Sequence, residues 1–327
     1  MPMIKRFTFS NNTLIDSTEA DAPVIVYINP DQQERASLCS TYSIDEHTLA
    51  SALDPDEVSR IEFSGSSVSL IWKRAMNYSS KDNFYFNVGS IGLFLTENRL
   101  IAVMEEDIPL LGNTVRPTVR FNTIQELLLA TLLVTIQQYL GHLKVIKMIA
   151  HDLQKRINTS MANEYLIQMF NLSESLVYYT NAISANGIAL GRLRTIAEKL
   201  NYDQRILDMI DDIVIENNQC YKQSEIYSTV FSGLMDARGS LVNNNMSMLL
   251  KNLTIINIVF LPLNLIAGIG GMSEYSMMTQ HIDWRVSYSV FLGAMVIIGW
   301  ITAYFLGKVN FTSINPFDVF KKQPKKE

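Results

Sequence analysis

The sequence predicts a mixed α/β domain that continues into long helices and ends in two membrane-spanning helices. Short apolar or alternating runs occupy residues 1–121, and helical periodicity without proline follows over residues 122–248. Two long uncharged segments then lie near the C-terminus. Of the 327 residues 48% are hydrophobic, yet the mean hydropathy is only +0.10. Most of the chain should therefore be water-soluble.

Residues 1–121 have the pattern of a mixed sheet accompanied by helices. The apolar or alternating runs are APVIVYIN, RIEFSGSSVSLIWKRAM, NFYFNVGSIGLFLT and RLIAVME. Alternation with a period of two, and short continuous apolar runs, are typical of strands. The segments DQQERASLCSTYSI and DEHTLASAL between some of these runs have helical character. We therefore expect an α/β fold for this part.

Residues 122–248 predict three long helices. Apolar residues recur every three or four positions in IQELLLATLLVTIQQYLGHLKVIKMIAHDL, LIQMFNLSESLVYYTNAI and ILDMIDDIVI. No strong breaker interrupts the third pattern from about Asp203 through the first uncharged segment, which predicts one helix of about 100 Å. A helix that long needs neighbours to pack on.

The two uncharged segments predict membrane spans at residues 249–270 and 285–307. No charged residue lies between Lys251 and Glu274 or from Val286 to Gly307, and about 20 residues cross 30 Å of hydrocarbon as a helix. The stretch GIGGMSEY follows the first span rather than a strand, which argues against a phosphate-binding loop. It predicts instead the start of a connecting loop over residues 271–284.

The distribution of positive charge predicts the orientation in the membrane. The N-terminus MPMIKRFTFSNN has no apolar core of a signal peptide, so the large first part should stay in the cytoplasm. Lys251 and the basic tail at residues 308–327 flank the spans, whereas Gly271–Trp284 contains no Lys or Arg. We expect an integral protein of the plasma (inner) membrane with both termini cytoplasmic. The tail KKQPKKE is interpreted as a topology signal and a contact for membrane lipids, not as a nucleic-acid site.

A polar stripe runs along the first predicted span. Asn257 and Asn264 lie seven residues apart and therefore share one helix face. The same face carries Ser247, Leu250, Leu253, Leu261 and Gly268. An unpaired amide in hydrocarbon costs on the order of 1–3 kcal/mol, so the stripe should bond to a neighbouring helix or line a water-filled path. Two spans cannot enclose a pore, so such a path would need several copies of the chain.

At these residues the chain resembles the CorA family of divalent cation transporters. LTIINIVFLPLNLIAGIGGMSEY resembles the first span and signature turn of that family, and SGLMDARGSLVNNNMSMLLKN resembles its stalk segment. The resemblance implies a funnel-shaped homopentamer with an α/β/α cytoplasmic domain, long stalk helices and a central pore for Mg²⁺, with Zn²⁺, Co²⁺ or Ni²⁺ as further cargo. It implies no cofactor other than the transported or regulatory divalent cation.

The resemblance also implies roles for individual residues. The pore would be lined by Ser247, Leu250, Leu253, Asn257, Leu261, Asn264 and Gly268, with Gly271, Met272 and Ser273 at the outer mouth. The leucines would form constrictions and the amides would hold a hydrated ion. In the family, an acidic residue low on the stalk binds a regulatory ion; that position corresponds to Asp212, with Asp208 and Asp211 nearby.

Two departures from the family concern the outer mouth. Ser273 stands where the family has Asn, and a hydroxyl offers one oxygen where Asn offers a carbonyl and an amide. The MPEL segment that follows in the family is missing, which leaves Glu274, Asp283 and His281 as cation-attracting groups of the loop. His281 would favour a softer ion such as Zn²⁺, so the ion stays open between Mg²⁺ and Zn²⁺.

The chemistry of an enzyme has no support in the sequence. HExxH, GxSxG and P-loop motifs are lacking, and His47, His142 and His151 stand apart as surface or core histidines. The alternative to a transporter is a membrane-anchored cytoplasmic scaffold or sensor. It accounts for the long helix and the basic tail, but it gives no reason for a polar stripe within the membrane.

Overall fold

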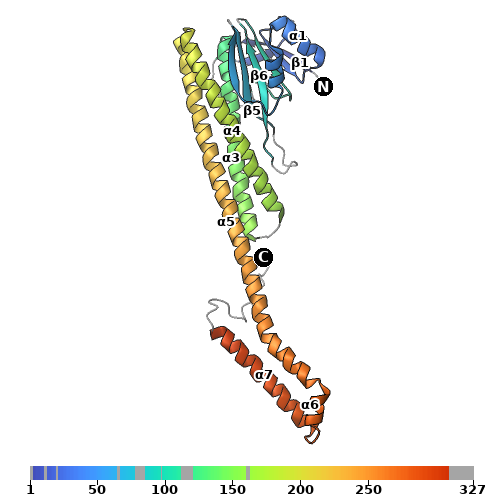
Figure 1. The fold of residues 1–327 in the computed structure, drawn as a ribbon. Helices are drawn as coiled ribbons and strands as arrows, with labels where there is room; N and C mark the ends of the chain where they lie inside the picture. Colours follow the sequence, from blue (N-terminus) through green and yellow to red (C-terminus); the bar gives the residue numbers. More distant parts are fainter. Residues whose placement is uncertain are drawn as a thin grey trace. The chain divides into compact units, whose positions relative to one another are not determined.

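The computed structural model describes residues 3–10, 13–19, 21–64, 67–77, 85–96, 98–111, 121–159 and 163–308. Packing divides the chain into two compact units, Met1–Met235 and Asp236–Glu327. Figure 1 shows the elements of both units. Apart from Lys308, the predicted basic tail lies outside the described residues.

The first unit is built on a mixed sheet with the strand order β2-β1-β3-β7-β6-β5-β4. The strands are β1 (Met3–Ser10), β2 (Thr13–Asp16), β3 (Val24–Ile28), β4 (Arg60–Ser64), β5 (Ser67–Ala75), β6 (Val88–Leu95) and β7 (Leu100–Met104). The central pair β3 and β7 is parallel, and the other pairs are antiparallel. Both central strands are buried along their whole length, as expected for strands covered on both faces.

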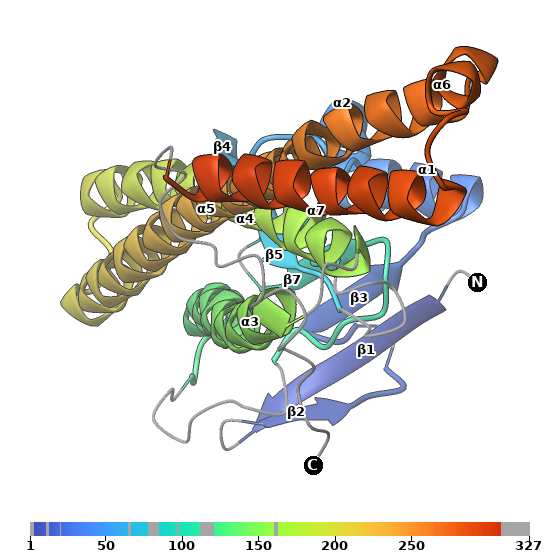
Figure 2. The ribbon, with the colours of Figure 1, turned by 90° about the horizontal axis from the view of Figure 1, so that it is seen from below.

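Helices cover both faces of this sheet, which makes the unit an α/β/α sandwich (Figure 2). The helices α1 (Gln32–Tyr42) and α2 (Glu46–Ala52) lie on one face. On the other lie α3 (Ile124–Thr159), α4 (Asn163–Lys199) and the first part of α5 (Gln204–Gly270). The neighbouring residues Ile71 and Trp72 of β5 belong to different hydrophobic clusters, because successive side chains of a strand point to opposite faces.

The predicted helical segments of the α/β part are confirmed, and their first turns explain where they begin. Asp31 and Glu34 form a capping box at the start of α1, with reciprocal bonds of 2.8 and 3.0 Å. Asp45 accepts the Thr48 N–H at 3.0 Å and caps α2. The hairpin β1–β2 is an additional element that the sequence patterns do not predict.

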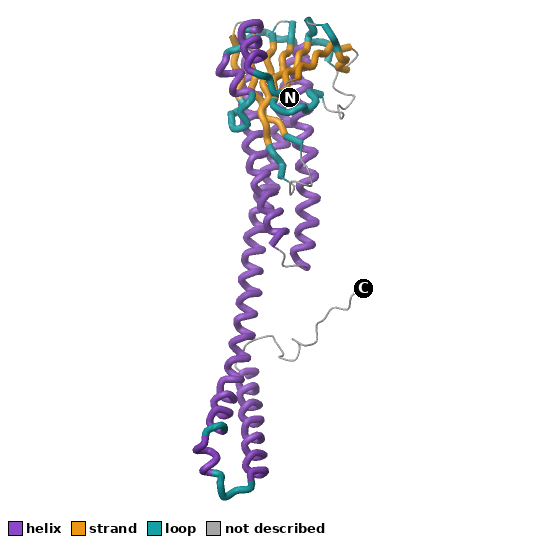
Figure 3. Tube along the Cα trace, turned by 90° about the vertical axis from the view of Figure 1, so that its right-hand side faces the viewer, coloured by secondary structure: helices purple, strands orange, loops and turns teal. Residues whose placement is uncertain are grey.

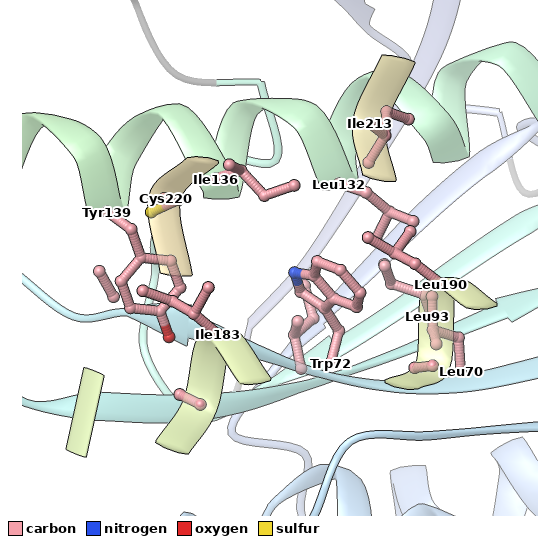
Figure 4. Close-up of a cluster of buried hydrophobic side chains, with 14 of the residues drawn as sticks. Leu70, Trp72, Leu93, Leu132, Ile136, Tyr139, Ile183, Leu190, Ile213 and Cys220 are labelled. Atoms are coloured by element: carbon pink, nitrogen blue, oxygen red, sulfur yellow. The ribbon is translucent and has the colours of Figure 1, made fainter. Parts of the chain in front are cut away.

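The large cluster between the sheet and α3–α5 is centred on Trp72 (Figure 4). Leu70, Trp72 and Leu93 of the sheet face Leu132 and Ile136 of α3, Ile183 and Leu190 of α4, and Ile213 and Cys220 of α5. The indole Nε1 donates to Thr135 at 2.7 Å, so its polar atom is satisfied inside the core. The change of pattern at Phe121 is therefore a change of element type within one compact unit.

The second unit contains the C-terminal part of α5, the short helix α6 (Ser273–Met278) and α7 (Trp284–Lys308) (Figure 3). As the lack of breakers predicts, α5 is a single helix through Gly270, with Pro262 inside it. By length and composition α5 and α7 are each able to cross a membrane, with windows of mean hydropathy 2.0 and 1.8. These windows are not buried within the single chain.

Candidate functional site

Within the second unit, α5 packs on α7 with the side that bears Leu263 and Gly270. A Cβ on Gly270 would lie 2.4 Å from the Phe291 ring, and Leu263 methyl carbons lie 3.6 and 3.7 Å from the Cβ position of Gly299. Leu263 and Gly270 are seven residues apart and share one face of α5. At about 100° per residue, the stripe through Asn257 and Asn264 is turned away from that face.

The polar stripe is solvent-accessible in the single chain. Leu250 and Leu253 are each 57% exposed and Leu261 is 73% exposed, and Ser247, Asn257, Asn264 and Gly268 are exposed as well. Around Gly268, no described atom other than those of its own helical turns lies within 4 Å of the Cβ position. Because α7 covers another side of α5, the amides do not serve as contacts to the partner helix of their own chain.

The predicted mouth residues form the turn between α5 and α6. The N–H of Gly271 donates to the carbonyls of Ala267 and Gly268 at 3.1 and 3.2 Å, which closes the end of α5. Met272 is the residue before α6 and Ser273 is its first residue. The Ser273 hydroxyl is exposed and lies 3.5 Å from the Glu274 carboxylate. The signature segment therefore presents a short polar side chain at the end of the helix.

The predicted entrance groups Glu274, His281 and Asp283 are all exposed. Asp283 accepts the backbone N–H of Arg285 at 2.9 Å, and the guanidinium of Arg285 lies 5.6 Å from the centre of the Trp284 ring. Arg285 belongs to the first turn of α7. Sequence reasoning missed its importance because the count of charges in the loop ended at Trp284. Its guanidinium contributes a positive charge two residues along the chain from Asp283.

The three aspartates near the N-terminal end of α5, which are Asp208, Asp211 and Asp212, have different surroundings. Asp208 accepts from Gln204 at 2.7 Å, and Asp211 accepts two bonds from Arg194 of α4. The pKa of Arg194 is raised, first of all by its hydrogen bond to Asp211. Asp212 is exposed. Among the described residues, no three His, Cys, Asp or Glu side chains of one chain are grouped to hold a metal ion.

Of the two environments expected for the isolated histidines, surface or core, His142 has the second. Its Nδ1 lies 2.7 Å from the Tyr179 hydroxyl, and burial lowers the pKa of His142 to about 4. The Tyr179 ring packs edge-on against Tyr139 at 4.9 Å. The imidazole therefore stays neutral and belongs to the packing of α3 on α4.

Comparisons with known proteins agree with this architecture. Residues 25–308 match the family described as CorA-like Mg²⁺ transporter protein. A cobalt/magnesium transport protein CorA of Thermotoga maritima is 38% identical over 85 residues, which are 26% of this chain and 23% of that protein. A magnesium transport protein CorA of Haemophilus ducreyi is 23% identical over 320 residues, which are 92% of this chain and 97% of that protein.

Three solved structures share the fold. The complete CorA magnesium transporter from Methanocaldococcus jannaschii has a TM-score of 0.71 at 20% identity and covers 95% of this chain and 98% of that chain. The full-length CmaX protein has a TM-score of 0.63 at 12% identity, over 93% and 97% of the two chains. The ZntB cytoplasmic domain from Vibrio parahaemolyticus has a TM-score of 0.54 at 12% identity, over 76% and 98%.

Proposed function

The chain belongs to the family of CorA-like Mg²⁺ transporter proteins, and on this premise we propose that it conducts divalent cations through a pore shared by several copies. The observation that carries the proposal is the stripe of Asn257 and Asn264, which is exposed and turned away from α7. Placed at the axis of a homopentamer, each position would supply a ring of five amides. The assembly would lie in the plasma (inner) membrane with both termini in the cytoplasm.

The pore would pass the ion with its hydration shell. Mg²⁺ sheds water reluctantly, and amide oxygens that touch the bound waters stabilise it without replacing them. Rings of Leu250, Leu253 and Leu261 would form dry constrictions that open when the helices move apart. At Gly268 the lack of a side chain leaves room near the outer end.

The outer mouth bears on which ion enters. The Ser273 hydroxyl would grip the hydration shell more weakly than the amide of the family signature. Glu274, His281 and Asp283 would attract cations, whereas Arg285 offsets one negative charge per copy. We propose Mg²⁺ as the main cargo. Zn²⁺, Co²⁺ or Ni²⁺ would be further cargo, because the Ser273 hydroxyl binds a hydration shell more weakly and the His281 imidazole is a softer ligand.

A cytoplasmic cation would regulate the pore through the aspartates of α5. Asp212 is exposed, and with Asp208 it would face a neighbouring copy across a bound cation. Asp211 is already paired with Arg194 and would position this segment rather than bind the ion. Loss of the cation would leave like charges facing each other and would loosen the closed ring.

The decisive experiment is a flux assay in liposomes with Mg²⁺-sensitive and Zn²⁺-sensitive dyes. The purified oligomer should produce a rise in internal Mg²⁺ that saturates with external concentration and is absent from empty liposomes. The ratio of the Mg²⁺ and Zn²⁺ rates gives the preference of the mouth. An assembled protein that moves neither ion would contradict the proposal and would favour the membrane-anchored scaffold.

A further inference from the structure

A cavity of about 1020 Å³ lies in the second unit between the end of α5, the loop that follows it and the first turns of α7. Its back wall is the close contact of α5 and α7, where Phe291 packs on Gly270. The Tyr275 ring lies 5.5 Å from that of Phe291, and the Tyr275 hydroxyl is 3.3 Å from the Ser287 hydroxyl. Residues of one chain therefore build the wall.

The lining of this cavity changes from charged to apolar along α7. Asp283 and Arg285 stand at one end with Thr279 and Gln280. Phe291, Leu292 and Met295 line the other end. Met295 is eleven positions after Trp284, so the apolar part reaches about 16 Å along the helix axis from the charged rim. A ligand that fills the cavity must itself be polar at one end and apolar at the other.

The rim lies at the depth expected for lipid headgroups. No charged residue follows Arg285 until Lys308, so α7 enters hydrocarbon directly after Arg285. Trp284 and Tyr288 also line the cavity, and aromatic residues of this kind favour the membrane interface. The deep apolar part therefore lies beside acyl chains, and the charged rim lies beside phosphates and amines.

The two charges of the rim have opposite signs and stand two residues apart. The backbone N–H of Arg285 holds the Asp283 carboxylate at 2.9 Å, and the Arg285 guanidinium lies over the Trp284 ring. A guanidinium recognises a phosphate through charge-assisted hydrogen bonds, and a carboxylate recognises an ammonium group. Together they complement a zwitterionic headgroup that carries both.

We propose that this cavity binds a phosphatidylethanolamine molecule of the surrounding leaflet. Its phosphate would lie at Arg285, its ammonium at Asp283, and one acyl chain would pack on Phe291, Leu292 and Met295. The proposal rests on insertion of α5 and α7 into a membrane, but not on ion conduction. A second copy of the chain fits the cavity less well, because it would bury the charges of Asp283 and Arg285 away from water.

The test measures lipids retained by the detergent-purified oligomer, using native mass spectrometry after titration with phosphatidylethanolamine or phosphatidylglycerol. The wild type should retain phosphatidylethanolamine preferentially. Asp283→Asn should lower this retention about ten-fold and leave phosphatidylglycerol nearly unchanged, whereas Arg285→Gln should lower both. Glu274→Gln is the matched control. It removes a carboxylate from the same loop, but Glu274 does not line the cavity. Its lipid retention should equal that of the wild type.

Two outcomes would overturn the proposal. One is that Asp283→Asn retains as much phosphatidylethanolamine and as much phosphatidylglycerol as the wild type does. The other outcome concerns Met295→Trp, whose larger side chain fills the apolar end of the cavity. If the wild type retains no more phosphatidylethanolamine than this variant, the lipid does not bind there, and another copy of the chain would occupy the cavity. Flux measured on the same preparations separates the two proposals. Lipid selectivity without flux refutes transport alone, and flux without lipid selectivity refutes the lipid site alone.

Discussion

The guanidinium of Arg194 donates to both carboxylate oxygens of Asp211, at 2.5 and 3.1 Å, and joins α4 to α5. The same guanidinium donates to Glu198 one turn further along α4. Asp211 is therefore bonded within its own chain, while its neighbour Asp212 is exposed. Of these two adjacent aspartates, Asp211 therefore links α4 to α5, whereas Asp212 is free to face another molecule.

Replacing Asp212 by Ala should remove regulation by cytoplasmic Mg²⁺. Flux should continue at high internal Mg²⁺, where the wild-type pore is proposed to close, because one carboxylate per copy no longer binds the cation. Flux in liposomes loaded with low or high Mg²⁺ measures the effect. Glu225→Ala is the matched control, because it removes an exposed carboxylate from the opposite side of α5, and it should keep the Mg²⁺ dependence. If Asp212→Ala matches the wild type at both concentrations, the regulatory site lies elsewhere.

Replacing Asn264 by Leu should reduce flux about ten-fold or more. The substitution exchanges a ring of amides for branched apolar groups and favours a dry constriction. Asn252→Leu makes the same change on the side of α5 turned away from the stripe and should conduct normally. Assembly of both variants is checked by size before reconstitution. Normal conduction by an assembled Asn264→Leu variant would place the pore along another face.

Replacing Gly270 by Ala should destabilise the contact between α5 and α7. The new Cβ would lie 2.4 Å from the Phe291 ring, and such overpacking costs about 1–3 kcal/mol. Gly293→Ala is the control, because no described atom other than those of its own helical turns lies within 4 Å of its Cβ position. Thermal unfolding in detergent should show a lower Tm for Gly270→Ala only, and the further change Phe291→Ala should restore part of the loss. Equal Tm values for both alanine variants would disprove the close contact.

Acid should destabilise the first unit through His142. Burial lowers the pKa of His142 from 6.5 to about 4, so the unfolded chain binds a proton in this range that the folded chain does not. The free energy of unfolding therefore falls as pH drops from 6.5 to 4, by up to about 1.4 kcal/mol per pH unit. Tm measured against pH should lose part of this slope in His142→Gln but not in the exposed control His151→Gln. Unchanged slopes in both would contradict the prediction.

The orientation of the spans can be tested with a cysteine at Met278, which is 83% exposed. An impermeant thiol reagent added to intact cells should label Met278→Cys, because the α5–α7 loop is proposed to lie outside. The parent chain, whose native Cys39 is proposed to lie on the cytoplasmic side, should be labelled only after lysis. Labelling of the parent in intact cells, without labelling of Met278→Cys, would invert the topology.

Much of the fold follows from patterns that one sequence displays. The runs Val24–Ile28 and Leu100–Met104 are apolar throughout and form the buried centre of the sheet. The uninterrupted periodicity after Asp203 predicts the long α5. The hairpin β1–β2 was missed because only a few of its side chains, among them Phe7 and Leu14, pack on the core. The adjacent polar residues Lys5 and Arg6 also interrupt the alternation that would mark a strand.

Features made by distant contacts had no signal in the sequence. The cavity beside α7 depends on Phe291 approaching Gly270, and a glycine-rich segment alone does not show which glycine is covered. The short helix α6 has no side-chain hydrogen bond at its N-cap, so no capping residue in the sequence predicts its start at Ser273. The stripe of Asn257 and Asn264 was recognisable because both residues belong to one regular helix. Its environment in an assembly stays a prediction.

The amide of Asn186 acts as a one-residue substitute for a neighbouring strand. It donates to the Lys73 carbonyl at 2.8 Å and accepts the Lys73 N–H at 3.0 Å, just beyond the point where β4 stops pairing with β5. An unpaired backbone edge invites a strand from another molecule, the first step of aggregation. Asn186 occupies the N–H and C=O of Lys73 from within the same chain, so at this position β5 offers no free backbone groups to a strand of another molecule.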